Sequence, residues 1–470
     1  MNIEQNDHFL SKFLVSADNK LKEVMGKIDS NGHGVALVVN KERKLLGLVT
    51  DGDIRRAIIN GEGINTPITT IMNESPAAIK ENYSPEEVTN TIKGKPINNL
   101  PILNEEGVVC NLLLREELHK IVSYSSNLFP KKNFDKEHKK ILVVGGAGFV
   151  GSVLTRQLLD KGYSVRVLDK FLFGESSIEE LKQNEKFSLV KGDIGHVEVI
   201  IEAIKDVDAV VHLAEIVGDP ACALDPEKTQ QINYLSTSLV ASICKHFQLN
   251  RFIYTSSCSV YGASQKGELL SENSELNPVS LYARMKIESE KHILNMSDSL
   301  FCPTILRLAT VFGESPRMRF DLVVNTLTAK AIREGKITLF GGDQWRPNVH
   351  VSDVAKAIIT VLEAPVEKVK GEVFNVGSEE NNLTINQIGK LIKENIPAAE
   401  LLIEERDIDK RDYKVSFSKI NQVLGFKNSL SVVEGIKEVA NSLRAGKYEN
   451  HCEDVYYNDR WYKIANKFLK

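Results

Sequence analysis

Short apolar runs alternate with stretches whose apolar residues recur every three or four positions, from about residue 140 to residue 308. A short apolar run bounded by polar residues fits a buried strand, whereas apolar residues three and four apart fit a helix with one buried face. Strands alternating with helices are typical of an α/β fold with a doubly wound parallel sheet. The sequence predicts strands at residues 141–144, 164–168, 187–190, 209–212, 252–255 and 304–308.

A longer amphipathic segment at residues 226–247 predicts the clearest helix. Its apolar residues form one stripe, which we assign to packing against the core. The residues of this stripe are Ile232, Leu235, Leu239, Val240, Ile243, Cys244 and Phe247. Beyond residue 308 the pattern loosens, which predicts a small C-terminal subdomain. We expect an aromatic-rich stretch, residues 451–463, to dock on this part of the chain.

The N-terminal part has a different pattern, which is repeated. Residues 14–58 and residues 77–122 each predict a helix, a strand, a polar turn, a second strand and a second helix, the order of a small α+β module. Internal repetition of this kind indicates two similar units that pack as a pair. A charged stretch that contains Pro130 predicts a linker. The expected domains are therefore residues 1–125, a linker at residues 126–138, and residues 139–470.

The composition is that of an ordinary globular chain. Of 470 residues, 42% are hydrophobic and 26% are charged, and the formal net charge is −4. This charge gives no general attraction to nucleic acid or to membranes. The chain has no apolar run of about 18 residues, and its first residues, MNIEQNDHF, lack the pattern of a signal peptide, so we expect a cytoplasmic protein. The six cysteines show no CxxC or metal-ligand spacing, so we expect reduced thiols and no metal site.

A glycine-rich turn, GGAGFVG at residues 145–151, lies between the first predicted strand and the helix that follows it. Gly145 allows a tight turn, Gly148 lets backbone N–H groups approach a pyrophosphate, and Gly151 lets the helix pack closely on the sheet. Asp169 ends the second strand, 18 residues after Gly151 (169 − 151), where its carboxylate can accept hydrogen bonds from both ribose hydroxyls of adenosine. Because this carboxylate would repel a 2′-phosphate, the pattern favours NAD over NADP.

Three polar residues further along the chain predict a hydride-transfer site. Tyr282 and Lys286 are four residues apart on a predicted helix, so they share a face, and we expect the ammonium group to lower the pKa of the phenol. Ser257 lies near the carboxyl end of a predicted strand, where its hydroxyl can hydrogen-bond a reacting oxygen. The phenolate of Tyr282 would then act as a general base. Without the glycine turn, the same Tyr and Lys would be interpreted as solvent-facing residues of an amphipathic helix.

From about residue 139 to residue 443 the chain resembles the extended short-chain dehydrogenase/reductases, the NAD-dependent nucleotide-sugar epimerase/dehydratase family with a Rossmann core. The glycine turn, Asp169, the turn at residues 192–194, the motif at residues 212–214, SSCSVYG and YARMK carry this resemblance. It implies that Ser257, Tyr282 and Lys286 are catalytic and that the looser region beyond residue 308 is the substrate-binding subdomain. In relatives, the helices that correspond to residues 226–247 and to Tyr282 often form a dimer interface, so the resemblance also implies a homodimer or higher oligomer.

The resemblance further implies a set of binding residues. The implied NAD-binding residues are Gly145, Gly148, Phe149, Val150, Gly151, Asp169, Lys170, Asp193, Ile194, Leu213, Ala214, Asn233, Tyr282 and Lys286. The implied residues for the nucleotide-sugar substrate are Ser257, Thr310, Arg319 and Arg346. Arg346 would reach the diphosphate, and the segment 346–353 would lie near it. For Arg317 and Arg319, contact with an anion and a surface ion pair are both open.

Two departures from the family pattern bear on the reaction. The 4,6-dehydratases carry an Asp-Glu pair directly after the Ser or Thr of this motif, where Cys258 and Ser259 stand in this chain. The resemblance therefore implies a 4-epimerase, which forms a transient 4-keto sugar and reduces it on the other face. Glu215 stands where Ala is common. The alternatives are a 4-keto-sugar reductase, another nucleotide-sugar oxidoreductase or dehydratase, and a nucleotide-sensing scaffold without activity.

The N-terminal repeat resembles a pair of cystathionine-β-synthase-type (CBS) domains. In the first unit the string TDGDIRRAI places Thr50 and Asp53 at the adenosine-contacting positions, whereas Leu114 and Glu117 occupy these positions in the second unit. The resemblance implies one intact site for an adenine nucleotide, with a regulatory role. Two other interpretations stay open: the pair only packs and dimerises, or Asp53 only caps a helix.

Overall fold

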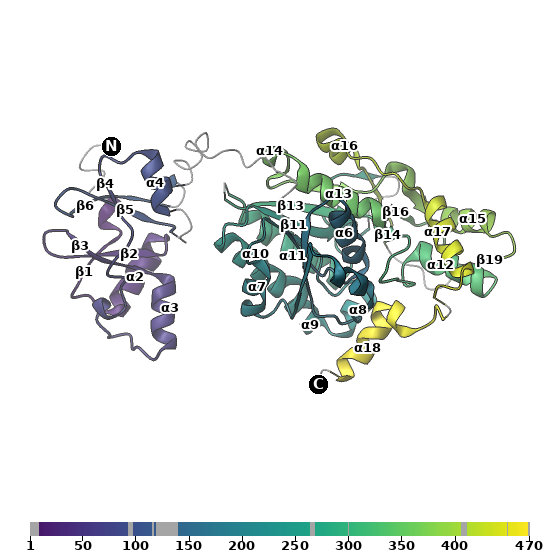
Figure 1. The fold of residues 1–470 in the computed structure, drawn as a ribbon, viewed down its shortest axis with the longest axis horizontal. Helices are drawn as coiled ribbons and strands as arrows, with labels where there is room; N and C mark the ends of the chain where they lie inside the picture. Colours follow the sequence, from purple (N-terminus) through teal and green to yellow (C-terminus); the bar gives the residue numbers. More distant parts are fainter. Residues whose placement is uncertain are drawn as a thin grey trace. The chain divides into compact units, whose positions relative to one another are not determined.

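The computed structural model describes residues 9–92, 97–114, 117–118, 140–263, 268–298, 300–405, 411–448 and 450–468. The chain divides into two compact units, Met1–Asn133 and Phe134–Lys470 (Figure 1). The predicted linker, residues 126–138, lies outside the described residues. Each unit has buried apolar clusters of its own.

The N-terminal unit contains two three-stranded sheets of the same design. In each, the first strand runs parallel to the second, the second pairs with the third in antiparallel fashion, and the register shifts near the end of the second strand. The first sheet consists of β1 (Leu14–Ser16), β2 (Val35–Val39) and β3 (Leu45–Thr50), and the second of β4 (Ile79–Lys80), β5 (Leu100–Leu103) and β6 (Val109–Leu113). The helices are α2 (Leu21–Asn31), α3 (Asp51–Ile59), α4 (Pro85–Ile92) and the 3-10 helix η1 (Ile68–Thr70).

The turns between the paired strands repeat in atomic detail. The Asn40 side chain accepts hydrogen bonds from the backbone N–H groups two and four residues later, at 3.0 and 2.9 Å. Asn104 does the same at 3.0 and 2.9 Å. The two Asn residues are 64 positions apart (104 − 40), as are Asp53 and Glu117 (117 − 53). The described residues of the N-terminal unit therefore show the internal repeat that the sequence pattern predicts.

The C-terminal unit is built on a seven-stranded parallel sheet with the order β17-β13-β11-β10-β7-β8-β9. Its strands are β7 (Lys140–Val144), β8 (Ser164–Asp169), β9 (Phe187–Lys191), β10 (Ala209–His212), β11 (Arg251–Ser257), β13 (Cys302–Leu308) and β17 (Val373–Val376). The six predicted strands are all present, with ends that differ by at most two residues. The seventh strand, β17, falls in the region that we assigned to the substrate-binding subdomain. That assignment was wrong for these residues, because β17 pairs with β13 at the edge of the sheet.

Both faces of the sheet are covered by helices (Figure 1). Alternate residues of a strand point to opposite faces, and in β7 the side chains of Ile141 and Val143 pack with helices α6 (Phe149–Asp160) and α13 (Val351–Glu363). Leu142 and Val144 pack on the other side, with α7 (Val197–Ile204) and the helix that ends near residue 247. This three-layer arrangement is the doubly wound fold that the alternating pattern predicts.

The predicted helix at residues 226–247 consists of α9 (Pro226–Gln230), a π-helical segment, η4 (Gln231–Ser236), and α10 (Thr237–His246). Val240 and Cys244 are fully buried against the sheet. Leu235 and Phe247 are 55% and 49% exposed. The assignment of the whole stripe to the core was therefore wrong at these two positions, because the stripe is wider than the face that the sheet covers.

The remaining elements are the strands of smaller sheets and the other helices. The strands are β12 (Leu269–Leu270), β14 (Thr310–Phe312), β15 (Lys336–Phe340), β16 (Trp345–His350), β18 (Asn382–Thr384), β19 (Glu400–Glu404) and β20 (Lys414–Val415). The α-helices are α8 (Asp219–Leu224), α11 (Leu281–Asn295), α12 (Val323–Arg333), α14 (Val366–Val369), α15 (Ile385–Asn395), α16 (Ser418–Leu424), α17 (Val432–Arg444) and α18 (Asn458–Phe468). The 3-10 helices are η3 (Ser176–Gln183), η5 (Cys258–Tyr261), η6 (Glu379–Asn381) and η7 (Asp454–Tyr456). A separate apolar cluster joins α12, α15 and α17.

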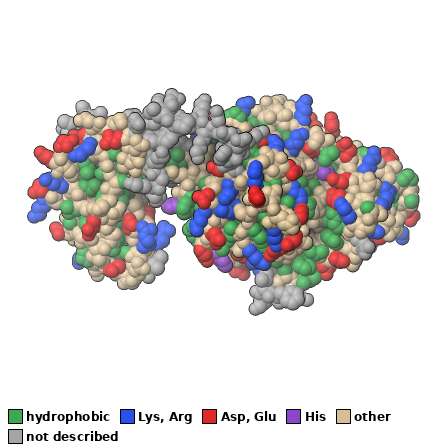
Figure 2. Space-filling model, viewed as in Figure 1, with side chains coloured by type: hydrophobic (Ala, Val, Ile, Leu, Met, Phe, Trp, Pro, Cys, Tyr) green, Lys and Arg blue, Asp and Glu red, His purple; other side chains and the backbone are tan. Residues whose placement is uncertain are grey.

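The surface shows mixed charge. On the face shown in Figure 2, Lys and Arg side chains are interspersed with Asp and Glu over both units. Among the described residues, the helices are too short or too polar to cross a membrane.

Candidate active site

A cavity of about 690 Å³ opens at the carboxyl ends of the parallel strands, where ligands bind in folds of this type. Its walls come from the loops after β7, β8 and β10, the end of β11, the helix α11 and the C-terminal subdomain. The predicted residues in its wall are Gly145, Gly148, Phe149, Val150, Gly151, Asp169, Lys170, Asp193, Ile194, Leu213, Ala214, Ser257, Tyr282, Lys286, Thr310, Arg319 and Arg346. One cavity therefore brings together residues that are far apart in the sequence.

The glycine turn has the backbone that its sequence requires. Gly145 has a φ of +85°, in the left-handed region, and its N–H donates to the carbonyl of Leu168 at 2.8 Å. A Cβ atom on Gly151 would lie 2.2 Å from the carbonyl oxygen of Gly145. Gly148 is the N-cap of α6, so the N-terminus of this helix faces the cavity. This end of a helix is a natural site for a pyrophosphate.

Asp169 is the last residue of β8, and its carboxylate is held by backbone groups. One oxygen accepts from the N–H of Ala147 at 3.0 Å and the other from the N–H of Phe171 at 2.8 Å. Each carboxylate oxygen has a second lone pair, so both can still accept from a ribose hydroxyl. Lys170 forms an ion pair with Asp193 at 2.8 Å across the same end of the cavity.

Asn233 does not line the cavity. It is fully buried in η4, where its side chain accepts from the N–H of Ile216 and donates to the carbonyl of Ile216, both at 2.8 Å. These two bonds fix the loop that follows β10. Asn233 is therefore not a residue of the cavity wall, as its inclusion among the cofactor-binding residues implied. Its side chain instead holds the loop at Ile216, whose neighbours line the cavity.

Ser257, Tyr282 and Lys286 all line this cavity. Ser257 ends β11, and Tyr282 and Lys286 lie in the first two turns of α11, which is capped by Ser280. The Lys286 ammonium nitrogen is 5.6 Å from the centre of the Tyr282 ring and donates to the carbonyl oxygen of Thr255 at 2.5 Å. The helical spacing thus places the Tyr and the Lys on one face of α11, as expected.

The electrostatics differ from the expectation. Lys286 forms a buried ion pair with Glu215 at 2.7 Å, and Glu215 accepts a hydrogen bond from the Tyr254 hydroxyl at 2.6 Å. Burial and, after it, the negative charge of Glu215 raise the pKa of Tyr282 well above its ordinary value. The prediction that Lys286 lowers the pKa of the phenol was therefore wrong, because burial and then the negative charge of Glu215 act in the opposite direction. The sequence showed Glu215 as a departure from the family pattern. It could not show the contact with Lys286, because the two residues are 71 positions apart (286 − 215).

Two predicted arginines of the cavity wall are held by contacts within the protein. Arg319 forms two hydrogen bonds with Asp321, at 2.8 and 3.0 Å. Arg346 donates to the carbonyl oxygens of Trp345, at 2.7 Å, and of Arg411. Within the predicted segment 346–353, only Arg346 lines the cavity. The other end of that segment is structural, because Asp353 accepts from the backbone of residues 429 and 430.

Arg317 is a further basic residue in the cavity wall. Its guanidinium lies 3.7 Å from the centre of the Phe173 ring and donates to the Asn458 side chain at 2.7 Å. Its Nε atom is buried and has no hydrogen-bond partner among the described residues. Burial and the neighbouring Arg319 lower the pKa of Arg317 to about 9. Of the two interpretations that the sequence left open for Arg317, an anion contact fits this position better than a surface ion pair.

The aromatic-rich stretch, residues 451–463, docks on the rest of the C-terminal unit, as expected. It does so at the cavity. In Figure 1, α18 lies beside α8. The Trp461 indole donates to the carbonyl of Leu172 at 2.6 Å, and Asn458 donates to the carbonyl of Val217 at 3.0 Å. Asn458 and Tyr462 line the cavity. The helix α18 therefore joins the loops after β8 and β10. The sequence did not predict this location. Its aromatic residues indicated that the stretch packs against the protein, but not which surface it covers.

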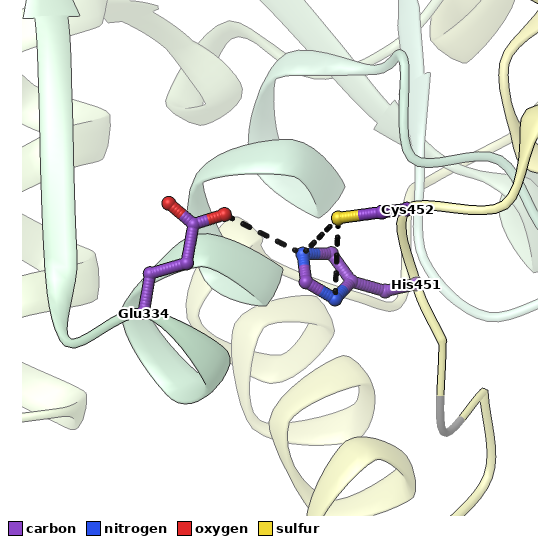
Figure 3. Close-up of side chains that lie close together, drawn as sticks. All are labelled: Glu334, His451 and Cys452. Atoms are coloured by element: carbon purple, nitrogen blue, oxygen red, sulfur yellow. Dashed lines mark hydrogen bonds and ion pairs between the residues drawn. The ribbon is translucent and has the colours of Figure 1, made fainter.

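Two sulfur-containing groups are candidates for reactive sites. Cys258 is buried, its thiol donates to the carbonyl of Arg307 at 3.3 Å, and burial raises its pKa, so it is a packing residue. Figure 3 shows Glu334, His451 and Cys452 close together. The Cys452 sulfur is 3.5 and 3.9 Å from the two ring nitrogens of His451.

Comparisons with known proteins agree with the fold. Residues 141–377 match the family described as "NAD dependent epimerase/dehydratase family", and residues 11–60 match the CBS domain. The uncharacterized UDP-glucose epimerase YtcB of Bacillus subtilis is 29% identical over 326 residues, which are 66% of this chain and 100% of that protein. UDP-glucuronic acid decarboxylase 1 of Xenopus tropicalis is 26% identical over 73% of this chain and 81% of its own length.

Two solved structures show the same likeness in three dimensions. The UDP-glucuronic acid 4-epimerase from Bacillus cereus, in complex with UDP-glucuronic acid and NAD, is 26% identical, with a TM-score of 0.58. The UDP-glucose 4-epimerase from Thermotoga maritima, with UDP-glucose, is also 26% identical, with a TM-score of 0.58. In each case the match covers 65% of this chain and 99% of the other.

Proposed function

Because the chain belongs to the NAD dependent epimerase/dehydratase family, we propose that it is an NAD-dependent nucleotide-sugar 4-epimerase. The observation that carries this proposal is the meeting of Ser257, Tyr282 and Lys286 with the glycine turn in one cavity. A protein that only sensed nucleotides would have no use for a buried phenol and ammonium at this place. The relatives named for UDP-sugars make UDP-sugars the first candidates for the substrate.

The residues of the outer cavity fit NAD. The close backbone approach at Gly151 leaves the helix N-terminus open to a pyrophosphate, and the Asp169 carboxylate has free lone pairs for a ribose. Phe149, Val150, Ile194, Leu213 and Ala214 would contact the cofactor from the sides. NAD, when bound, supplies the acceptor and donor of hydride.

The protein's own side chains manage the proton and the oxygen. Tyr282 takes the proton of the sugar's 4-hydroxyl as hydride leaves C4, and returns it when hydride comes back to the other face. Ser257 donates a hydrogen bond to the reacting oxygen from the end of β11. Thr310, Arg319 and Arg346 hold the substrate, and Arg317 offers its buried N–H to an anion. The 4-keto sugar must turn over within the cavity so that hydride returns to its other face.

A 4-keto-sugar reductase is the second candidate. It would use the same three catalytic residues, and the raised pKa of Tyr282 suits a group that donates a proton to a ketone. The two reactions differ in their use of cofactor, because a reductase consumes a reduced dinucleotide in each turnover whereas an epimerase returns the hydride. A dehydratase is less well supported, since Cys258 and Ser259 replace the acidic pair.

The N-terminal unit is proposed to bind an adenine nucleotide at Thr50 and Asp53. Thr50 caps α3, and Asp53 accepts from the backbone and side chain of Thr50 at 2.8 and 2.7 Å. Asp53 is therefore not the N-cap, as the sequence left open, but the residue in the first turn of α3 that completes a capping box with Thr50, and this contact orients its carboxylate. Glu117 accepts from the N–H of Leu114 at 3.1 Å at the equivalent place, but Leu114 brings no hydroxyl.

We also propose a homodimer and a cytoplasmic location. The exposed apolar side chains of Leu235 and Phe247 support a dimer interface on the helix at residues 226–247. Burial of such side chains against a second copy would remove apolar surface from water.

The function is tested by incubating the purified full-length protein with UDP-glucose, UDP-glucuronic acid and matched GDP- and dTDP-sugars, with and without added NAD. Product stereochemistry is followed by NMR. We expect interconversion of C4 epimers without net formation of NADH, and loss of this activity in Tyr282→Phe. Stoichiometric consumption of NADH with a 4-keto sugar would show a reductase instead, and release of carbon dioxide from UDP-glucuronic acid would show a decarboxylase.

A further inference from the structure

Glu215 lines the cavity and lies three residues after the end of β10. Its side chain is 1% exposed and that of Lys286 is 5% exposed, so the two charges meet in a place that bulk water does not reach. The Tyr254 hydroxyl holds the first carboxylate oxygen at 2.6 Å, and the Lys286 ammonium lies 2.7 Å from the second. The proposed epimerase mechanism does not use this carboxylate.

The contacts of Lys286 show what the carboxylate does. The ammonium is fixed between the carbonyl of Thr255, at 2.5 Å, and Glu215. It also lies over the ring of Tyr254, 4.8 Å from the ring centre, and 5.6 Å from the centre of the Tyr282 ring. An ammonium with a carboxylate at hydrogen-bond distance acts on its surroundings as a nearly neutral pair. With an Ala at position 215, the same ammonium would act on the phenol with its full charge.

We propose that Glu215 is a positioning residue for the hydride-transfer step: it fixes Lys286 between β10 and β11 and offsets the positive charge that would otherwise act on Tyr282. The inference rests on the proposed function, since it assigns a role within that site. It explains why a carboxylate stands where the family pattern has Ala. The ionisation of Tyr282 then depends on a residue other than Ser257 and Lys286.

The other groups that face Tyr282 do not replace Glu215. Asp219 and Cys222 of α8 and Glu215 act in the direction that keeps the phenol protonated, and Arg319 acts in the opposite direction. Tyr462 of α18 packs in the same apolar cluster as Tyr282. Of the carboxylates, Glu215 has the largest effect on the phenol, and it contacts Lys286 directly.

The first test compares Glu215→Gln with the wild-type protein. The substitution keeps the size of the side chain and removes its charge. Activity should rise with pH as Tyr282 loses its proton. In Glu215→Gln this rise should come at a pH lower by about one unit or more, as expected for the loss of a nearby charge in a buried site. The matched control is Glu290→Gln, which neutralises the carboxylate of another buried ion pair, with Arg307 at 2.7 Å. This control should lower the melting temperature and leave the pH profile in place.

A second readout needs neither substrate nor turnover. The ionisation of Tyr282 is followed by the ultraviolet absorbance of tyrosinate, as the difference between each protein and the same protein carrying Tyr282→Phe. The absorbance change should appear at lower pH in Glu215→Gln than in the wild type. If the wild type interconverts no sugar but this difference is seen, the proposed function fails, and only the electrostatic effect of Glu215 on Tyr282 is retained. If the wild type is active but the difference is absent, the inference about Glu215 fails and the proposed function stands.

A double-mutant comparison keeps the test decisive if Glu215→Gln alone does not fold. Lys286→Met leaves the carboxylate without its partner, so the phenol should ionise at higher pH than in the wild type. Adding Glu215→Gln to Lys286→Met should bring the ionisation back down toward the wild-type position, because the wild-type pair is nearly neutral. The inference is overturned if removal of the carboxylate leaves the ionisation of Tyr282 unchanged in both backgrounds, or if Glu290→Gln moves it equally.

Discussion

Gly151→Ala should disable the cofactor site by adding a single methyl group. Gly151 lies in the first turn of α6, and a Cβ there would lie 2.2 Å from the Gly145 carbonyl oxygen, 2.7 Å from the Gly146 Cα and 2.9 Å from the Gly146 carbonyl carbon. All three atoms belong to the backbone, so no side-chain rotation relieves the contact. The turn and the helix must therefore move apart.

The size of the effect follows from two opposing contributions. Overpacking of this kind costs about 1–3 kcal/mol, and a clash with backbone on every side belongs at the upper end. The change from Gly to Ala within a helix contributes about 1 kcal/mol in the other direction. The net loss in the free energy of unfolding is about 2 kcal/mol. Because the displaced turn is the part that would hold the pyrophosphate, we expect NAD affinity to fall by about tenfold or more, a change of about 1.4 kcal/mol.

The same substitution elsewhere in the chain provides the control. Gly26 lies in the helix α2, is exposed, and has no atom within 4 Å of an added Cβ. Gly26→Ala should stabilise the N-terminal unit by up to about 1 kcal/mol. Thermal unfolding and NAD titration by calorimetry measure both variants. If Gly151→Ala melted like the wild type and bound NAD with unchanged affinity, close packing at Gly151 would not be what shapes the cofactor site.

Four further predictions concern the other sites. Tyr282→Phe should lower turnover by about 100-fold or more while calorimetry still detects NAD binding; a loss of less than tenfold would exclude Tyr282 as the base. Asp169→Ala should weaken NAD binding by about tenfold to 100-fold, by the loss of charged hydrogen bonds, and leave NADP binding no weaker; equal losses for both cofactors would contradict its role at the ribose. Trp461→Ala should speed NAD release in stopped-flow measurements by about tenfold, because one hydrogen bond and a ring contact are lost; an unchanged release rate would show that α18 does not retain the cofactor. Asp53→Asn should weaken binding of AMP or ATP to the full-length protein, whereas Glu117→Gln should not; identical calorimetric titrations would leave the N-terminal unit without a nucleotide role at Asp53.

The sequence predicts the features that depend on neighbouring residues. Residues 141–144 are apolar throughout, so they specify a strand buried on both faces. The spacing of Gly145, Gly148 and Gly151 specifies a turn followed by a helix. The four-residue spacing of Tyr282 and Lys286 places them on one side of α11. Each of these conclusions needs only a few consecutive residues and the geometry of one element.

Features that depend on distant residues escaped the sequence. The strand β17 is short, and only its pairing with β13 identifies it as part of the sheet. Position 215 was visible as a departure, but its effect on Tyr282 arises where β10, β11 and α11 meet. The exposure of Leu235 follows from the width of the surface that the sheet offers, which no helical pattern contains. In each case a contact across the fold decides the outcome.

The helix α18 also connects two loops of the cavity wall, one at the proposed cofactor site and one at the proposed substrate site. Asn458 accepts from Arg317 and its N–H donates to Asp321, while Trp461 bonds the loop at Leu172. A cofactor that orders the loop after β8 should thereby steady the loop at residues 317–321, and so favour the sugar nucleotide. Thermodynamic linkage then requires reciprocity. If the dinucleotide raises the affinity for the sugar nucleotide by some factor, the sugar nucleotide must raise the affinity for the dinucleotide by the same factor.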